Sequence, residues 1–502
     1  MRWSLALAAL FVACAASTAR AERGFDPEAI YHIPVADAAT RGAGDALVTI
    51  VEFSDFSCRF CRLSQTTLRD LELLYGDDLR VAFRHHPLDP QHATLAAEAA
   101  EAARVQGRFW AMHDRLFSRR APMSRALVMG FARDLGLDTA RFARDLDSHR
   151  FRDAIIADVS FARRVGISGT PTFFINGRPV RGAQQLGVFV TVIDQELARA
   201  KKLVAGGTPR AKVYEAAIAS GYRTATAGAN PPDVRGAKLS PTATYPVALG
   251  PRGLRRGPDD APVTVVVMSD FECPFCGRNV ATIDRLRRAY GKTLRISVRP
   301  FPLTGHPHAR LAAEAAMAAA AQGKFWPYHD LLFAHQQALT RADLERYARG
   351  IGLDMARFVH DLDNHTYLRE IVRSIADASA LGVRSTPTLF VNGSPIRGAK
   401  PYDVIKAVVD ARLSEARALI ASGMAPADVY HAVTKAPMID EPAAPAVAAP
   451  IVLDDIDFHI AALLACKSGQ KEQAAHFYEN LRGERRRLVH DDCKKLGVAL
   501  PP

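Results

Sequence analysis

Two short stretches share one pattern and decide the fold of this chain: "FSDFSCRFC" at 53–61 and "MSDFECPFC" at 268–276. In each stretch, two cysteines stand three residues apart, after Ser-Asp-Phe-Ser in the first and Ser-Asp-Phe-Glu in the second. Two cysteines at this spacing can bind a metal, form a structural disulfide or exchange electrons. The surrounding sequence decides between these three roles.

The two stretches belong to a longer internal repeat. "GRFWAMHDRLF" at 107–117 returns as "GKFWPYHDLLF" at 323–333, and "GTPTFFING" at 169–177 returns as "STPTLFVNG" at 385–393. A repeated unit of about 200 residues has the size of a whole domain and is too long for a solenoid repeat. The sequence therefore predicts two copies of one domain in tandem.

Each copy has the pattern of an α/β unit. The β-branched runs "ALVTIVEF" at 46–53 and "PVTVVVM" at 262–268 predict a buried central strand before each cysteine pair. After the pair, apolar residues recur at helical spacing, and the predicted helix ends at Gly76 or Gly291. A second strand follows. A long alanine-rich stretch predicts several helices, and the Asn-Gly turns that follow predict a hairpin and then a last helix.

Composition and charge narrow the class of protein. The chain has 502 residues, of which 48% are hydrophobic and 24% charged, which is typical of globular domains. Its formal net charge is +12, but its Lys and Arg residues are scattered, without a basic run interleaved with aromatic residues. We therefore expect no nucleic-acid partner.

The first residues have the features of a secretory signal. A charged start at Arg2, an apolar block at 5–16 and the small-x-small end "ARA" at 19–21 predict export, with cleavage after Ala21. No later segment approaches the roughly 20 apolar residues of a spanning helix, so we expect no transmembrane segment. Cys14 follows a sequence similar to a lipoprotein acylation box, which makes lipid anchoring the alternative to a cysteine in a discarded segment.

The position of Cys58 at a strand-to-helix junction favours redox chemistry. Free N–H groups and the helix dipole stabilise a thiolate there, and Arg59 adds a cation. Cys61 lies one turn further on and can form the disulfide, and Cys273 and Cys276 repeat the arrangement. A zinc site built from both pairs and an inert structural disulfide are the alternatives.

Both copies resemble one known family. The turn "SDFxCxFC", the Thr-Pro pairs and the Gly-x-Phe-Trp motifs at 107–110 and 323–326 are similar to those of the DsbA-like thiol:disulfide oxidoreductases, over about 45–200 and 260–412. The resemblance implies an α/β fold with two tandem thioredoxin-fold domains, each with a helical insertion. It identifies the chain as a bacterial, exported member of that family.

The resemblance also implies roles for the Thr-Pro pairs. In this family, a threonine and a cis-proline face the cysteines and bind the substrate backbone. The resemblance implies this role for Thr170-Pro171 and Thr386-Pro387. Most X-Pro bonds are trans, but the repetition of the pair after each helical stretch favours cis. An ordinary proline at a strand entry is the alternative.

The two copies differ near their cysteines. The family keeps a buried acid at the position of Glu52, where it relays a proton to or from the second cysteine, whereas the second copy has Val267. A desolvated Glu has a raised pKa suited to proton transfer, and a Glu at a strand edge facing water is the alternative. The residues between the cysteines, 59–60 and 274–275, also differ, so we expect different redox potentials.

These patterns divide the chain into six parts. We expect a signal peptide (1–21), thioredoxin-like domain 1 (22–205), a connecting segment and linker (206–244), thioredoxin-like domain 2 (245–415), a helical tail with an Ala/Pro-rich linker (416–450) and a C-terminal helical hairpin (451–502). Cys466 and Cys493 are each on an expected helix of this hairpin. A disulfide between them is the favoured role, because so small a segment needs a covalent link.

The expected function is exchange of disulfides with protein thiols in the periplasm. Cys58 and Cys273 are the expected nucleophiles, and Cys61 and Cys276 resolve. Expected partners are unfolded or reduced exported proteins and a membrane redox partner; no metal or organic cofactor is implied. A disulfide isomerase or reductase, and a peptide-binding chaperone, remain as alternatives because the motif does not set the direction of exchange.

Overall fold

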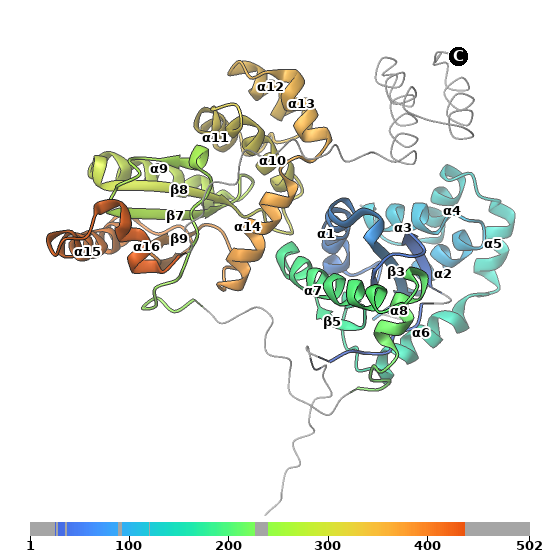
Figure 1. Cartoon of the computed structure of the whole chain (residues 1–502). Helices are drawn as coiled ribbons and strands as arrows, with labels where there is room; N and C mark the ends of the chain where they lie inside the picture. The colour runs from blue at the N-terminus through green and yellow to red at the C-terminus, as the bar shows by residue number, and fades with distance from the viewer. Residues whose placement is uncertain are drawn as a thin grey trace, which may run out of the picture. The chain divides into compact units, whose positions relative to one another are not determined.

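The computed structural model describes residues 26, 29–35, 38–88, 93–119, 121–225 and 239–436. Within this part of the chain there are two five-stranded sheets (Figure 1). We call the described residues of 29–225 domain 1 and those of 239–436 domain 2. The expected signal peptide, Cys14, the C-terminal hairpin and the Cys466–Cys493 disulfide lie outside the described residues.

Domain 1 has a mixed sheet in the order β1-β3-β2-β4-β5, in which only β2 and β3 are parallel. Its strands are β1 (Ala39–Gly42), β2 (Val48–Ser54), β3 (Leu79–His85), β4 (Thr172–Ile175) and β5 (Arg178–Arg181). Its helices are α1 (Arg59–Tyr75), α2 (Ala93–Arg104), α3 (Phe109–Ser118), α4 (Arg125–Asp134), α5 (Thr139–Asp147), α6 (Arg152–Arg164), α7 (Leu186–Ala205) and α8 (Val213–Ile218).

Domain 2 repeats this topology in the order β6-β8-β7-β9-β10. Its strands are β6 (Arg255–Arg256), β7 (Val263–Ser269), β8 (Leu294–Pro300), β9 (Thr388–Val391) and β10 (Ser394–Arg397). Its helices are α9 (Pro274–Tyr290), α10 (Ala309–Ala320), α11 (Phe325–Ala334), α12 (Arg341–Gly350), α13 (Met355–Asp363), α14 (Leu368–Ala380), α15 (Tyr402–Ala421) and α16 (Val429–Thr434).

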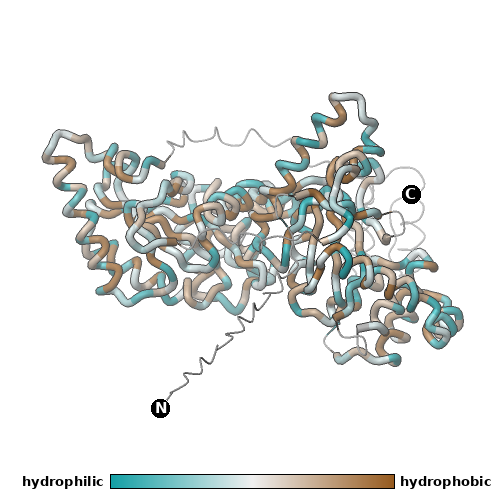
Figure 2. Tube along the Cα trace, turned by 90° about the horizontal axis from the view of Figure 1, so that it is seen from below, coloured by the Kyte–Doolittle hydropathy of each residue, from teal (hydrophilic) through white to brown (hydrophobic). Residues whose placement is uncertain are grey.

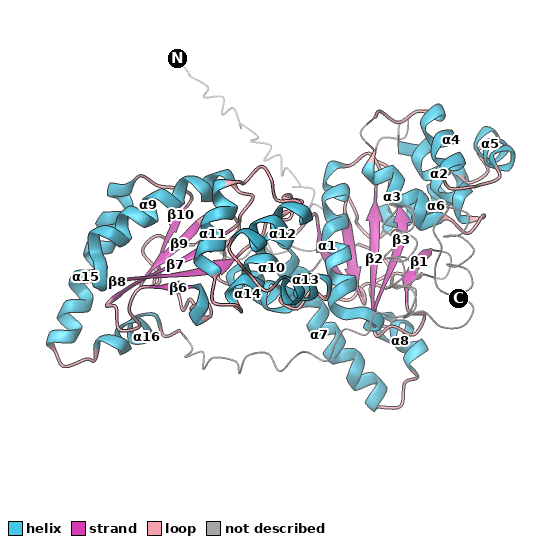
Figure 3. Cartoon of the chain, turned by 90° about the horizontal axis from the view of Figure 1, so that it is seen from above, coloured by secondary structure: helices cyan, strands magenta, loops and turns pink. Residues whose placement is uncertain are grey.

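The central strands explain why each sheet forms where it does. All seven residues of β2, and all seven of β7, are buried, as their β-branched sequences predict for a strand covered on both faces. Figure 3 shows helices on both sides of each sheet. In Figure 2, hydrophobic and hydrophilic residues alternate along the helices of both domains, as expected of helices that bury one face. The predicted α/β class with two thioredoxin-like domains, each with a helical insertion, is confirmed.

The helical insertion depends on small side chains. Five alanines of α2, and five at the equivalent positions of α10, are at most 1% exposed: Ala96, Ala99, Ala100, Ala102, Ala103, Ala312, Ala315, Ala316, Ala318 and Ala319. Residues without long side chains let neighbouring helices approach closely while retaining high helix propensity. Among the helices that the structure describes, none combines the length and the apolarity needed to span a membrane.

The Asn-Gly turns tie each hairpin to its central strand. Asn176, which is fully buried, adopts a positive φ of 45° and is followed by Gly177 with a φ of 87°. Its Oδ1 accepts a hydrogen bond from the backbone N–H of Thr49 (2.9 Å), and its Nδ2 donates to the carbonyl oxygen of Leu47 (3.0 Å). Asn392 makes the equivalent contacts in domain 2.

Replacing Asn176 by Ala is expected to lower the free energy of unfolding of domain 1 by about 2–4 kcal/mol, because two buried backbone groups lose their partners. Urea denaturation of the full chain measures this change. The exposed Lys201, replaced by Ala, serves as the control and should change stability by less than about 0.5 kcal/mol. Equal effects of the two replacements would contradict the assigned role of Asn176.

Candidate active site

An aspartate shapes the turn that presents each cysteine pair. In domain 1, Asp55 Oδ1 accepts hydrogen bonds from the backbone N–H of Ser57 (2.7 Å) and from its hydroxyl, and Asp55 Oδ2 accepts one from the backbone N–H of Leu88 (3.0 Å). The carbonyl oxygen of Asp55 accepts the N–H of Cys58 (3.0 Å). Asp270 makes the equivalent contacts with backbone N–H groups in domain 2. The Asp of the repeated "SDF" is therefore a structural residue of the site.

Cys58 is the N-cap residue of α1, and Cys273 is the N-cap residue of α9. Both adopt extended backbone conformations with nearly equal angles, φ −75° and ψ 121° for Cys58 and φ −74° and ψ 119° for Cys273. Pro274 occupies the first position of α9, where its missing N–H costs no hydrogen bond. Each first cysteine thus lies where a helix presents its unpaired N–H groups.

The two thiols of each pair have opposite acidities. A hydrogen bond from the Cys61 thiol, together with the Thr170 hydroxyl and the backbone N–H groups of Cys61 and Phe60, lowers the pKa of Cys58 to about 5 against the opposing effect of burial. Burial raises the pKa of the Cys61 thiol well above its usual range, and the neighbouring Cys58 raises it further. The pair therefore combines a thiolate at neutral pH with a thiol that keeps its proton.

Domain 2 repeats this division. The pKa of Cys273 is lowered to about 5, and the largest contribution comes from a hydrogen bond of the Cys276 thiol. Burial raises the pKa of Cys276. All four cysteines carry free thiols in this structure. The acidities of the two cysteines are therefore divided in the same way in both sites.

Each Thr-Pro pair lies against the first cysteine. The Thr170–Pro171 and Thr386–Pro387 peptide bonds are cis, as the sequence predicts. As a thiol, Cys58 Sγ donates to the carbonyl oxygen of Thr170 at 3.5 Å, and Cys273 Sγ contacts Thr386 in the same way at 3.5 Å. Within the described residues, the buried hydroxyls of both threonines have no hydrogen-bond partner. They are therefore available to donate to a thiolate.

Glu52 lies behind the pair in domain 1. It is fully buried in β2 between its register neighbours Phe83 and Phe173, so the alternative of a water-facing strand edge is wrong. Its Oε1 accepts hydrogen bonds from Ser54 Oγ (2.8 Å) and Gln65 Nε2 (3.1 Å). Burial raises the pKa of Glu52 to about 7, although both hydrogen bonds and the charge of Arg41 oppose the rise.

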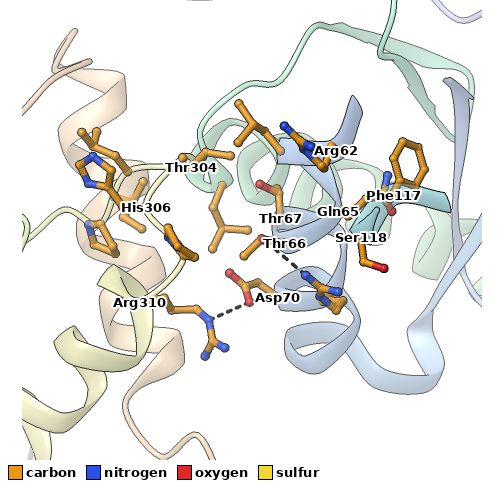
Figure 4. Close-up of a pocket in the computed structure, with 18 of the residues that line it drawn as sticks. Arg62, Gln65, Thr66, Thr67, Asp70, Phe117, Ser118, Thr304, His306 and Arg310 are labelled. Carbon is orange, nitrogen blue, oxygen red and sulfur yellow. Dashed lines mark hydrogen bonds and ion pairs between the residues drawn. The ribbon is translucent and has the colours of Figure 1, made fainter. Parts of the chain in front are cut away.

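Gln65 is a residue that the sequence alone did not single out. It projects from α1, one turn after Cys61 and two turns after Cys58, and Figure 4 labels it beside Arg62, Thr66 and Thr67 on that helix. It also donates to the carbonyl oxygen of Cys61 (3.2 Å), so that it joins Glu52 to the second cysteine. Domain 2 has Val280 at the equivalent position and Val267 in place of Glu52.

Comparison with known proteins assigns the family. The family described as Thioredoxin matches residues 36–195 and again residues 250–411, which together make up more than half of the chain. The chain therefore belongs to the thioredoxin family, with two family domains in one polypeptide. This membership and the two cysteine pairs support a thiol–disulfide oxidoreductase-type function.

The curated relatives carry a different kind of name. A protein of Herminiimonas arsenicoxydans named Na(+)/H(+) antiporter NhaA is 44% identical over 156 residues, which cover 31% of this chain and 25% of that protein. Na(+)/H(+) antiporter NhaA 3 of Salinispora tropica is 44% identical over 163 residues, 32% of this chain and 25% of that protein. The chain thus spans about a quarter of the length of these relatives. The name antiporter describes those whole proteins.

These relatives correct the narrower family assignment. From its sequence, the chain was expected to be a bacterial, exported DsbA-like thiol:disulfide oxidoreductase. This assignment is wrong, because relatives at 44% identity are named as antiporters. The cause lies in the motifs. A cysteine pair at a helix start and a facing Thr-Pro loop belong to the thioredoxin fold as a whole, so they do not single out one of its subfamilies.

Solved structures are similar to single copies of the repeat. A thioredoxin-like oxidoreductase from Silicibacter pomeroyi is 29% identical and covers 33% of this chain and 94% of its own, with a TM-score of 0.30. BdbD from Bacillus subtilis is 24% identical and covers 34% of this chain and 98% of its own, with a TM-score of 0.32.

Replacing Thr170 by Val is expected to raise the pKa of Cys58 from about 5 to about 6 or 7, because the thiolate loses a hydroxyl donor. The pH dependence of iodoacetamide alkylation, followed on the Cys58 peptide by mass spectrometry, measures this pKa. Thr386→Val is the matched control, since it should move the Cys273 profile and leave that of Cys58 unchanged. An unchanged Cys58 profile in Thr170→Val would count against the hydroxyl.

Replacing Glu52 by Gln should stabilise reduced domain 1 above neutral pH. The folded-state pKa of Glu52, about 7, lies above the usual 4.5, so its contribution to stability is present below pH 4.5 and is lost as the pH rises through 7. The variant should therefore be more stable than the parent by about 3 kcal/mol at pH 8 and equal to it at pH 4. Urea denaturation at both pH values tests this; a gain of the same size at pH 4 would contradict it.

Proposed function

We propose that the chain is a protein thiol:disulfide oxidoreductase of the cell envelope that exchanges disulfides with protein substrates at two sites. The acidity of Cys58 and Cys273, beside buried second cysteines, carries this proposal. In it, Cys58 and Cys273 are the nucleophiles, Cys61 and Cys276 resolve, Glu52 relays a proton in domain 1, and Thr170, Pro171, Thr386 and Pro387 position the substrate backbone.

The oxidative half-reaction uses each pair as a two-electron acceptor. A substrate thiolate attacks Sγ of Cys58 in the Cys58–Cys61 disulfide, which forms a mixed disulfide and releases Cys61 as a thiolate. Cys61 then takes up a proton, for which Glu52 is the nearby donor, because its pKa of about 7 lies below that of the buried thiol. A second substrate thiolate attacks the substrate sulfur of the mixed disulfide and releases Cys58 as a thiolate. The substrate is oxidised to a disulfide and the pair is reduced to one thiol and one thiolate.

The acidity of the first cysteine favours this direction. A stabilised thiolate lowers the free energy of the reduced pair, which makes the disulfide form the stronger oxidant. Because both first cysteines have a pKa of about 5, this factor favours oxidation of substrates at both sites. A partner must then reoxidise each pair, and we propose a membrane redox protein for that step.

An exposed phenylalanine beside each thiol supports a polypeptide substrate. Phe60 and Phe275 lie between the cysteines of their pairs, and each is 51% exposed. Large apolar side chains at the surface are typical of sites that bind other chains. Unfolded proteins offer both the apolar residues and the free thiols that such a site needs. The signal-like segment 1–21 supports a periplasmic location, where disulfides persist.

Refolding of reduced, denatured ribonuclease tests the function. With glutathione disulfide as the oxidant, the full chain should accelerate the return of ribonuclease activity, and Cys58→Ser with Cys273→Ser should abolish the acceleration because no mixed disulfide can form. Each single variant should retain part of it. If the double variant accelerates refolding as well as the parent, the oxidoreductase proposal fails and the chaperone alternative gains support.

A further inference from the structure

Domain 2 contains a cavity that reaches the second cysteine of its pair. It has a volume of about 520 Å³ and lies between β7, β8, α9 and α11. Cys276 is part of its lining, together with the aliphatic side chains of Val267, Val280, Ile296 and Val298. A volume of this size is within the range of sites that bind small molecules.

The cavity is a property of this copy's side chains. Val267, Val280 and Val298 occupy the positions that Glu52, Gln65 and Phe83 occupy in domain 1. All three domain 1 side chains are larger and buried, and Phe83 stacks on Phe56 at a centroid distance of 5.2 Å. Three replacements by valine therefore remove the side chains that fill the equivalent space beneath the pair in domain 1.

One polar atom in the lining lacks a partner. Asn279 is 3% exposed and lines the cavity, and its Oδ1 has no hydrogen-bond partner within the described residues. A buried amide oxygen without a donor is costly, because it has lost its hydration without compensation. The atom is thus suited to accept a hydrogen bond from a molecule inside the cavity.

The charged residues of the lining are already paired. Arg287 lies 2.9 Å from Asp284, and Arg256 lies 3.9 Å from Asp330 while its guanidinium covers the ring of Trp326 at 4.2 Å. Two cations matched by two anions offer no net charge to a ligand. The rest of the lining is mostly aliphatic and aromatic, and such walls hold water poorly.

From this lining we infer that the domain 2 cavity is a binding site for a small uncharged molecule with an apolar body and one hydroxyl group, such as a phenol. The apolar body fills the space between Val267, Val280 and Val298, and the hydroxyl donates to Asn279 Oδ1. Because Cys276 lines the same space, the bound molecule lies against the second cysteine of the pair.

p-Cresol and p-xylene, which differ only by a hydroxyl in place of a methyl group, are suitable probes. Saturation-transfer NMR on the reduced full chain should show saturable p-cresol binding with a Kd below about 1 mM. Val298→Phe and Val280→Gln place the domain 1 side chains in the cavity and should each weaken binding at least tenfold. Near-unchanged melting temperatures of the two variants exclude unfolding as the cause.

Asn279→Leu separates the hydrogen bond from the apolar contacts. Leucine has a similar volume but no acceptor, so p-cresol should bind about five- to tenfold more weakly while p-xylene changes less than about twofold. The inference is overturned if p-cresol does not bind, if binding survives both filling variants, or if Asn279→Leu affects the two probes equally. Binding is measured without any thiol reaction, so the result is independent of the proposed exchange function.

Discussion

The interaction between the two cysteine side chains of each pair has the largest effect on the acidity of the first cysteine. It requires one cysteine at the N-cap of a helix and a second, buried cysteine one turn further along the same helix. The first cysteine becomes acidic because the second donates a proton to the hydrogen bond, and the second stays protonated because it is buried. Asp55 and Asp270 set the turn, and the Thr-Pro loops close the site from the opposite side.

The two copies share this front and differ behind it. Domain 1 places Glu52, Ser54 and Gln65 in one hydrogen-bonded group next to the second cysteine. Domain 2 keeps Ser269 but has valines at the other two positions, and a cavity lies beneath Cys276. The first cysteines both have a pKa of about 5, so the clearest difference between the two sites is the presence of a buried acid near the second cysteine of domain 1. A duplicated domain can in this way retain one reaction while its two sites diverge.

Much of the fold was predictable because its signals are local. The β-branched runs predict β2 and β7, Gly76 and Gly291 end α1 and α9, and the repeated Thr-Pro pairs have the expected cis bonds. The cause of the acidity was only partly predictable. The helix N-terminus and Arg59 were expected to stabilise the Cys58 thiolate, whereas the largest contribution comes from the Cys61 thiol, a contact that depends on how the second cysteine is buried.

Other features depend on tertiary packing and left no signal in the sequence. Gln65 looks like an ordinary helix residue until α1 packs on β2 and brings it to Glu52. Val267 and Val298 are ordinary strand residues, and a single valine such as Val280 is common enough in a helix to give no signal. The missing volume becomes apparent only when the three side chains line one space in the folded domain. The subfamily could not be read from the motifs either, because they belong to the thioredoxin fold in general. The roles of the catalytic, substrate-binding and proton-relay residues stay predictions.

Thiolate absorbance at 240 nm gives the most direct test of the central claim. The measurement uses the reduced full chain with Cys14, Cys466 and Cys493 replaced by Ala, so that only the two pairs contribute. The account predicts that absorbance equal to two thiolates appears with a midpoint near pH 5, and that the two buried thiols stay protonated to the end of the titration. Four thiols that titrate together at about pH 8.5, the value of an unperturbed cysteine, would contradict it.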